Sequence, residues 1–232
     1  MPRREEKSPS DKTSPCPSLA RRGADRDTLN KYLMHPFGRV ASSIMRLFVA
    51  IELSDAVRSA LRAAQAALRP KCDGVRCVPP EHLHLTVKFL GEVRDADVPG
   101  VCEAVQRAAA AARTLAMSVA ECGCFPERGP VRIVWVAAEE PSGRLAGCVE
   151  ATERELEALG FAREARAFSP HITIGRVRED RSRGAMRTAV EAFRLAEAEA
   201  VEQDVSSLTL MSSVLSPNGP TYSVVSRAKL GA

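Results

Sequence analysis

Two short motifs in this chain carry residue types suited to acid–base chemistry. A histidine precedes a threonine by two positions at His84 and Thr86, and again at His171 and Thr173, in a chain with only four histidines. An imidazole can donate or accept a proton near neutral pH. A threonine hydroxyl can donate a hydrogen bond to an anionic oxygen. Two such pairs that meet around one phosphoryl group could therefore act on it as an acid and a base.

The motifs lie in segments whose composition predicts strands. Alternate side chains of a strand point to opposite faces, so the histidine and threonine of each motif should share one face. The opposite face should be buried and apolar, and we expect it to carry Leu83, Leu85, Val87, Phe89, Ile172 and Ile174. The same alternation predicts Lys88 on the face of His84, as an exposed lysine. It predicts Arg176 on the face opposite His171, unless a bulge or a strand end at Gly175 turns it.

Strand-like and helix-like segments are mixed along the rest of the chain. The patterns predict helices at 55–68, with Ser54 as N-cap, and at 96–113, 142–159 and 182–200. They predict strands at 47–53, 83–90 (ending at Gly91), 115–122, 132–138, 171–177, 205–215 and 221–230. Several of these strands are joined by short loops, which favours an α+β fold with largely antiparallel sheet. A glycine-rich phosphate loop of standard spacing is absent from the sequence, which disfavours nucleotide-cofactor folds.

Composition separates the first 44 residues from the remainder. Residues 1–44 hold nine basic and five acidic residues, so the whole net charge of +4 lies there and residues 45–232 are neutral. We expect 1–44 to be a disordered, dispensable extension and 45–232 to be one domain. A neutral body argues against broad duplex binding. The chain shows neither an apolar membrane span nor a signal peptide, and seven irregularly spaced cysteines favour reduced thiols in a cytoplasmic protein.

The two motifs, in their flanks and in this order, resemble the 2H phosphoesterase superfamily, and most closely its RNA 2′,3′-cyclic phosphodiesterase branch, also called 2′-5′ RNA ligase. The resemblance covers residues 46–230. It is carried by RLFVAIEL at 46–53, HLTVKFLGEV at 84–93, FPERGPVRIVW at 125–135, FSPHITIGRV at 168–177 and LTLMSSVLSPNGPTYSVV at 208–225. The implied fold is bilobal, with two pseudo-symmetric lobes of antiparallel sheet flanked by helices and the site between them.

The implied activity is hydrolysis of RNA 2′,3′-cyclic phosphate ends to 2′-phosphomonoesters, without a metal or other cofactor. We expect His171 to act as the base toward water and His84 as the acid toward the leaving 3′ oxygen, although the sequence symmetry permits the reverse. Thr86 and Thr173 should hold the non-bridging oxygens. Expected substrates are RNA ends, tRNA fragments included, and cyclic nucleotides. We expect a monomer, with weak 2′-5′ ligation as the reverse reaction.

Other residues near the motifs have weaker assignments. The family often carries an arginine at the position of Arg176, where it could clamp phosphate with its fork of donors. Phe48 matches an aromatic residue of the family's first strand, and it could stack on a base or simply pack in the core. For Trp135, core burial is the favoured interpretation.

Three alternatives stay open on the sequence alone. His82, His84 and His171 could bind a metal ion as a three-histidine site, although the threonines would then have no reason to repeat with the histidines. The chain could instead be a 2H module that binds RNA ends or nucleotides without turnover. The two motifs could also be coincidental in an unrelated α+β protein.

Overall fold

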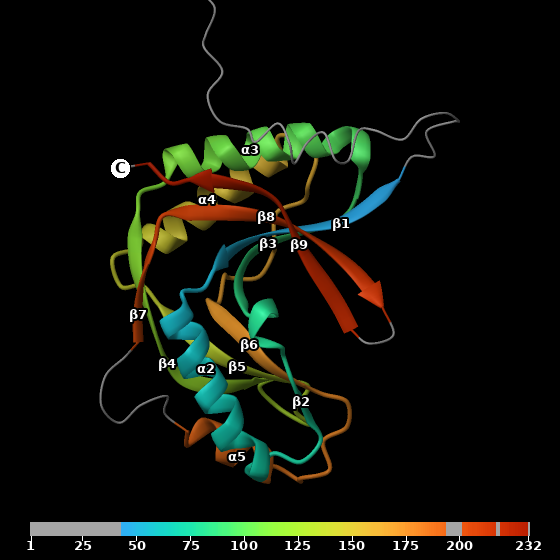
Figure 1. The fold of residues 1–232 in the computed structure, drawn as a ribbon, viewed down its shortest axis with the longest axis vertical. Coiled ribbons are helices and arrows are strands. Elements are labelled where there is room, and N and C mark those ends of the chain that lie inside the picture. Colours follow the sequence, from blue (N-terminus) through green and yellow to red (C-terminus); the bar gives the residue numbers. More distant parts are fainter. Residues whose placement is uncertain (1–42, 194–200, 217–218, 232) are drawn as a thin grey trace, which may run out of the picture. The chain divides into compact units, whose positions relative to one another are not determined.

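The computed structural model describes residues 43–193, 201–216 and 219–231 (Figure 1). The strands are β1 (Ile44–Glu52), β2 (Val75–Cys77), β3 (His84–Arg94), β4 (Leu115–Phe125), β5 (Ile133–Glu139), β6 (His171–Val177), β7 (Val201–Val205), β8 (Ser207–Ser216) and β9 (Gly219–Lys229). The helices are α2 (Asp55–Leu68), α3 (Val98–Ala111), α4 (Arg144–Glu157) and α5 (Ala185–Glu191), and a 3₁₀ turn, Pro80–His82, precedes β3.

The described strands form a sheet in the order β7-β4-β5-β6-β3-β1-β8-β9, and the strand pairs along it are antiparallel. The short strand β2 also pairs with β6, on the side where β3 pairs. β3 and β6 meet at Leu85 and Ile172, and this short junction connects a half-sheet of β3, β1, β8 and β9 to a half-sheet of β6, β5, β4 and β7. The prediction of an α+β fold with two antiparallel lobes is therefore confirmed.

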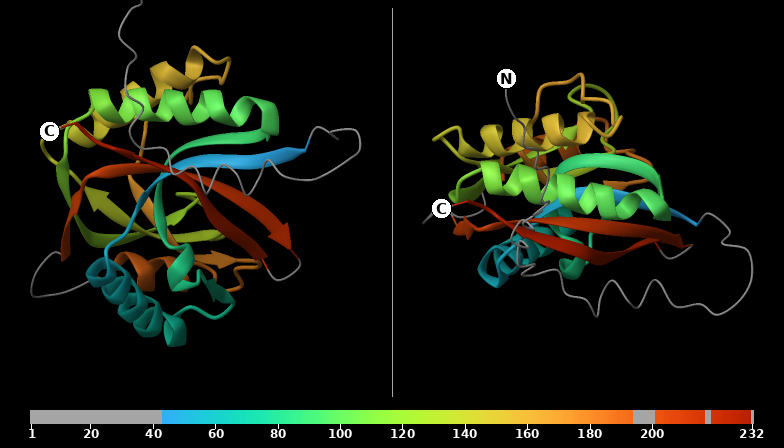
Figure 2. Two further views of the ribbon diagram at one scale, coloured as in Figure 1. Left: turned by 45° about the horizontal axis from the view of Figure 1, so that its top comes forward. Right: turned by 90° about the horizontal axis from the view of Figure 1, so that it is seen from above.

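Helices cover one face of each half-sheet. α3 and α4 pack together against β3, β8 and β9, while α2 and α5 lie against β6, β7 and β4 (Figures 1 and 2). α2 begins where predicted, because the Ser54 hydroxyl accepts a hydrogen bond from the backbone N–H of Val57. Its apolar stripe, with Val57 and Leu61 fully buried, packs toward the sheet. The motifs lie on the sheet face opposite the core.

The predicted boundaries agree with the structure in some elements and differ in others. The helix at 55–68 and the strand at 171–177 have the predicted bounds, whereas the short strands β2 and β7 were not predicted. β1 begins at Ile44, one residue before the expected start of the domain, and residues 1–42 lie outside the described residues. Of the helix predicted at 182–200, α5 is the part that the structure describes as helical, and 194–200 lie outside the described residues.

The β1–β3 pairing contains a β-bulge directly after the first motif. Ala50 lies opposite Thr86 and Val49 lies opposite Lys88, so Val87 between them has no register partner on β1. The register shifts again before Gly91, whose φ of +72° suits glycine, so β3 continues past the predicted end at this residue. A bulge inserts one extra residue into a strand, so it reverses the alternation of faces beyond it.

The second motif is followed by a bulge at the equivalent position. Trp135 lies opposite Thr173 and Val134 lies opposite Gly175, so Ile174 has no register partner on β5. A Cβ atom on Gly175 would lie 2.6 Å from Cγ1 of Val75, so glycine is required where β2 approaches β6 this closely. Both bulged residues lie three positions after the histidine of their motif. The internal repeat of the sequence therefore extends to the backbone irregularities that follow it.

Candidate active site

The junction of β3 and β6 brings both motifs onto one face of the sheet, called here the site face. Leu85 and Ile172 are register partners with fully buried side chains that point into the core. Extending this register by one residue on either side puts His84 opposite Thr173 and Thr86 opposite His171. These four motif side chains are half-buried, in contrast to the two between them. The histidines are diagonal neighbours, which corresponds to about 7–8 Å between the two residues in an antiparallel pair.

Each imidazole is held by the same backbone contact. Nδ1 of His84 lies 2.7 Å from the carbonyl oxygen of His82, and Nδ1 of His171 lies 2.7 Å from that of Ser169. A carbonyl oxygen only accepts, so Nδ1 carries the hydrogen and donates in both rings. The proton-transferring nitrogen of each ring is therefore Nε2. Two residues with the same tautomer and the same support from position i−2 are suited to act as a matched acid and base.

Arg58 of α2 supports the turn that holds His84, which the sequence analysis did not anticipate. Its Nη1 donates to the carbonyl of Pro80 at 2.7 Å, and its Nε donates to the carbonyl of Leu53 at 3.0 Å. The turn Pro80–His82 is thereby tied to the end of β1 and presents the His82 carbonyl to the imidazole. An arginine on a predicted amphipathic helix carries no signal of this contact, since its partners are main-chain atoms distant in sequence.

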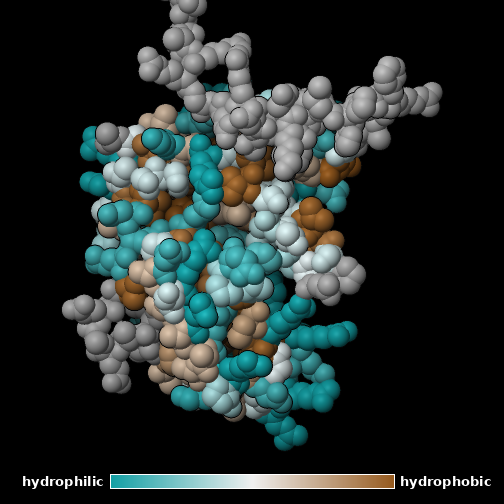
Figure 3. Space-filling model, in the orientation of Figure 1, coloured by the Kyte–Doolittle hydropathy of each residue, from teal (hydrophilic) through white to brown (hydrophobic). Residues whose placement is uncertain are grey.

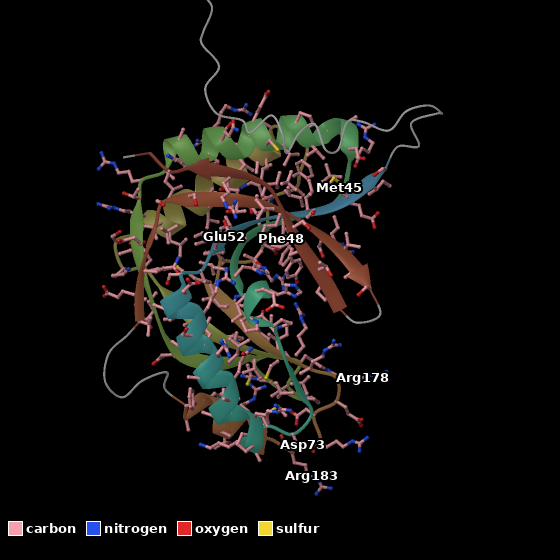
Figure 4. The ribbon with its side chains drawn as sticks, in the orientation of Figure 1. Met45, Phe48, Glu52, Asp73, Arg178 and Arg183 are labelled. Atoms are coloured by element: carbon pink, nitrogen blue, oxygen red, sulfur yellow. The ribbon has the colours of Figure 1, made fainter. Side chains whose placement is uncertain are left out.

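Aromatic rings surround His84. Its ring centroid lies 4.8 Å from that of Phe48 and 5.2 Å from that of Tyr222, which meets it edge-on at 90°. Phe48 is only 3% exposed, near the middle of β1 (Figure 4). This burial favours packing beneath the imidazole, the second of the two interpretations of Phe48, over stacking on a base. Tyr222 was missed as a site residue because β9 approaches β3 only in the tertiary structure.

A second pair of aromatic rings lies beside His171. Its ring centroid is 5.1 Å from that of Phe125 and 6.2 Å from that of Trp135. Trp135 is half-buried and pairs with Thr173 across β5 and β6, so it borders the site instead of lying wholly in the core. Its Nε1 is buried and makes no hydrogen bond. The two histidines thus share a common plan, in which an aromatic pair limits the movement of each ring.

The two bulges determine which face of the sheet the residue five positions after each histidine occupies. After Ile174 the alternation reverses, so Arg176 faces the same way as His171, as its assignment required. The bulge lies at Ile174 and not at the expected Gly175. After Val87 the same reversal turns Phe89 outward, where it is 74% exposed and 6.1 Å from Phe48 between ring centroids. The prediction that Phe89 lies on the buried face was therefore wrong.

Lys88 is also on the opposite face from the one predicted. It pairs with Val49 across β1 and β3 and is 5% exposed. Its Nζ lies 2.6 Å from Oε2 of Glu153 on α4 and donates to the carbonyl of Ala162 at 2.8 Å. The exposed lysine expected beside His84 is instead a buried ion pair between sheet and helix, because the bulge at Val87 shifts the side chains of β3 by one face until the register shifts again before Gly91.

The electrostatic environment lowers the pKa of His84 below its usual value near 6.5. Burial has the largest effect, because it disfavours the charged imidazolium. The hydrogen bond to the His82 carbonyl opposes the shift, whereas the positive charges of Arg176 and Arg58 add to it. Burial raises the pKa of Tyr222, and the positive charge of Arg176 opposes that rise, so the same guanidinium acts on both rings. His84 therefore releases a proton readily when protonated.

Other reactive groups are less suited to chemistry at this site. Burial raises the pKa of the Cys124 and Cys148 thiols to about 11, so both are protonated near neutral pH. Within 43–193, 201–216 and 219–231, no three His, Cys, Asp or Glu side chains gather in a way that could hold a metal ion. The His82 ring instead packs against Tyr222, with 4.9 Å between centroids. These observations argue against the three-histidine metal alternative.

Two similar half-sheets that present a pair of His-x-Thr motifs on a shared face define the 2H class of phosphoesterases. A family model described as LigT-like phosphoesterase matches this chain twice, at residues 51–135 and 136–222, so each match contains one motif. The chain therefore belongs to the LigT-like phosphoesterase family. In the part of the chain that the structure describes, none of the helices has both the length and the apolar character needed to cross a membrane.

Similar proteins cover most of this chain. An RNA 2′,3′-cyclic phosphodiesterase of Thermus thermophilus is 36% identical over 191 residues, which span 80% of this chain and 90% of the relative. One of Archaeoglobus fulgidus is 32% identical, with 77% and 96% covered. A crystal structure of a Thermus thermophilus protein superimposes with a TM-score of 0.64 at 30% identity, over 80% of this chain and 98% of that one. Escherichia coli LigT in complex with 3′-AMP shares the fold, with a TM-score of 0.65 at 22% identity over 82% of this chain and 100% of that one.

Proposed function

We propose that this chain hydrolyses RNA 2′,3′-cyclic phosphate ends to 2′-phosphomonoesters by acid–base catalysis with His84 and His171. The observation that carries the proposal is the register of β3 and β6, which gives both imidazoles and both threonine hydroxyls the same face. The name of the relatives from Thermus thermophilus and Archaeoglobus fulgidus, RNA 2′,3′-cyclic phosphodiesterase, supports the choice of substrate.

In the proposed reaction, water attacks phosphorus while the bond from phosphorus to the ribose 3′ oxygen breaks. Nε2 of His171 takes a proton from the water, and Nε2 of His84 gives a proton to the 3′ oxygen. Each such transfer typically contributes a factor of about 10²–10⁴. The lowered pKa of His84 makes its imidazolium a stronger acid and also reduces the protonated fraction near neutral pH, so the pH dependence of the reaction decides which role the ring has. The diagonal placement of the two rings fits an attack and a departure on opposite sides of phosphorus.

The neighbouring side chains have supporting roles in this scheme. Thr86 and Thr173 donate hydrogen bonds to the non-bridging oxygens, and Arg176 neutralises their charge with its guanidinium. Phe48 supports the His84 ring from below. Phe89, exposed on the site face, provides a ring on which a base can stack. The positions of these side chains relative to the two histidines support these roles.

A direct test uses an oligoribonucleotide that ends in a 2′,3′-cyclic phosphate, incubated with the full chain in the presence of EDTA. We expect turnover to a 2′-phosphate product, identified by chromatography against 2′- and 3′-phosphate standards. A 3′-phosphate product would reverse the direction of ring opening. Binding without turnover would instead favour the alternative of a non-catalytic 2H module, and loss of turnover on adding EDTA would revive metal catalysis.

The proposal extends to substrate range and setting. RNA ends, such as those of tRNA fragments, and small cyclic nucleotides present the same reacting atoms, so we include all of them as substrates. Weak 2′-5′ ligation is the reverse of the same proton transfers. We further propose a cytoplasmic monomer whose catalytic domain begins with β1, so that residues 1–42 are dispensable. Removing residues 1–42 and measuring activity tests this division, because Ser43 and Ile44 contact β3 and its following turn.

A further inference from the structure

A second arginine lies beside Arg176 on the site face. Arg76 of β2 is the register partner of Arg176 of β6, and partners in an antiparallel pair point to the same face. Arg76 is exposed. The two guanidinium groups therefore lie next to each other on the face that carries the imidazoles, and the charge of Arg176 is one of those that lower the pKa of His84.

The side chain of Arg76 extends toward β9. A Cβ atom on Gly219, at the start of β9, would lie 3.6 Å from Nη2 of Arg76. The same strand carries Tyr222, three residues later, whose ring contacts His84 and His82. β2 and the ends of β8 and β9 lie toward the same side of the view in Figure 1 and in the left view of Figure 2. Strand β9 thus borders the site face along the row from His84 to Arg76.

Arg76 and Arg176 are directly opposite each other, and each guanidinium has five N–H donors from which an anion can accept. Hydrophilic side chains gather over β2 and its neighbours (Figure 3). A phosphate bound between the two histidines can accept hydrogen bonds from Arg176. A second anionic group, one step farther along the substrate, would come within reach of Arg76.

We propose that Arg76 binds the phosphodiester on the 5′ side of the terminal nucleotide, so that the site selects RNA chains over cyclic mononucleotides. This inference rests on the proposed function, since Arg176 must hold the cyclic phosphate for Arg76 to meet the next one. A guanidinium forms charge-assisted, paired hydrogen bonds to phosphate oxygens. The ligand is thus a ribonucleotide with a phosphate on its 5′ oxygen, and a cyclic nucleoside phosphate lacks that group.

The test compares two substrates in the full chain and in Arg76→Gln. The substrates are adenosine 2′,3′-cyclic phosphate and the dinucleotide ApA with the same cyclic end. We expect kcat/KM to be higher for the dinucleotide, and its ratio to that for the mononucleotide to fall by about five- to tenfold in Arg76→Gln. The slope of log KM for the dinucleotide against log salt should also decrease by about 0.7, as for one lost phosphate contact on a single strand.

Two controls separate recognition of charge from structural damage. Arg181→Gln removes another exposed arginine, which pairs with Glu179 after β6, and should leave the substrate ratio unchanged. Arg76→Gln should change the melting temperature by no more than about 2 °C, since it replaces an exposed side chain. A dinucleotide whose linking phosphate is replaced by an uncharged methylphosphonate should lose its advantage over the mononucleotide. An equal ratio in the full chain and Arg76→Gln, or full activity on the methylphosphonate, would overturn the proposal.

Binding of the products tests Arg76 even if the chain does not turn over. Calorimetric titration with adenosine 2′-phosphate and with ApA 2′-phosphate should show tighter binding of the dinucleotide, and Arg76→Gln should reduce that difference. If neither cyclic substrate is hydrolysed but this preference persists, the hydrolytic function fails while the Arg76 site stands. If both substrates are hydrolysed and the preference is absent, the Arg76 site fails while the hydrolytic function stands.

Discussion

Leu85 and Ile172 are register partners at the junction of the two half-sheets, and both side chains are fully buried. Since side chains alternate along each strand, burying these two residues forces the motif residues that flank them onto the site face. The core and the proposed catalytic group are thus fixed by the same pairing. The arrangement makes several consequences of substitution testable.

Replacement of either imidazole should abolish most of the activity. His84→Ala and His171→Ala should each lower kcat by at least about 10²–10⁴-fold on a cyclic phosphate substrate, because each removes one proton transfer. The matched control is His82→Ala, which keeps the main-chain carbonyl that holds Nδ1 of His84. We expect it to lose less than about tenfold. Circular dichroism should show that all three variants remain folded.

Comparable losses in all three variants would instead favour a three-histidine metal site. A fully active His171→Ala would contradict the proposed mechanism, whatever the effect at His84. The comparison is informative because His82 lies two residues from His84, and its ring packs on Tyr222.

The pH dependence of kcat/KM should reveal which role His84 has. Burial and the charge of Arg176 lower its pKa, so Arg176→Gln should raise it. If His84 is the acid, it must be protonated to act, and the decline of kcat/KM at high pH should move to higher pH in Arg176→Gln. If His84 is the base, it must be neutral, and the rise of kcat/KM at low pH should move upward instead.

The measured quantity is the pH at which kcat/KM rises or declines, because Arg176→Gln should also lower kcat/KM at every pH by removing a phosphate contact. Arg178→Gln provides the control. Arg178 lies apart from Phe48, whose ring contacts the His84 imidazole, toward the lower right of the view (Figure 4). In this variant the rise and the decline of kcat/KM should occur at unchanged pH. If they are also unchanged in Arg176→Gln, the charge of Arg176 does not influence the pKa of His84.

Replacing only one residue of the Lys88–Glu153 ion pair should lower the free energy of unfolding strongly. Their side chains are 4% and 9% exposed. Lys88→Met leaves a buried carboxylate without its partner, and we expect about 3–5 kcal/mol less stability in urea unfolding. The double variant Lys88→Met with Glu153→Leu should recover most of that loss, because it removes both buried charges. A loss below about 1 kcal/mol in Lys88→Met would show that the lysine is not buried as described.

Stability should depend on pH through Glu52. Its carboxylate accepts hydrogen bonds from Arg227 at 2.6 and 3.0 Å and from Thr209 at 2.9 Å, and the Arg227 hydrogen bond is the main reason that its pKa is lowered. A carboxyl group with a lowered pKa in the folded state stabilises the fold above its unfolded pKa. That contribution is lost as the pH falls through the folded pKa.

Glu52→Gln should therefore reduce the free energy of unfolding by about 1 kcal/mol at pH 7, since the pair is partly exposed. The difference from the unmodified chain should shrink as pH falls from about 5 toward 2. Urea unfolding at several pH values measures it, with the exposed Glu92→Gln as control. A difference that stays constant with pH would exclude ionisation of Glu52 as its origin.

The sequence by itself determined the two motifs, their shared alternation, the α2 helix with its Ser54 cap and the family resemblance. These features are local, because a two-residue period and a side-chain N-cap need no distant partner. The resemblance likewise depends on the order of residues along the chain. The α+β fold followed from the mixture of helical and strand periods.

Only the tertiary structure decided which face Lys88, Phe89 and Arg176 occupy. A bulge arises from the register between a strand and its neighbour, and a single inserted residue inverts the positions up to the next bulge while leaving the sequence pattern unchanged. The same holds for Arg58, whose partners are main-chain carbonyls, and for Tyr222, which reaches His84 from another strand. The chemistry-bearing residues could thus be found along the chain, but the residues that surround them depend on pairings between distant segments.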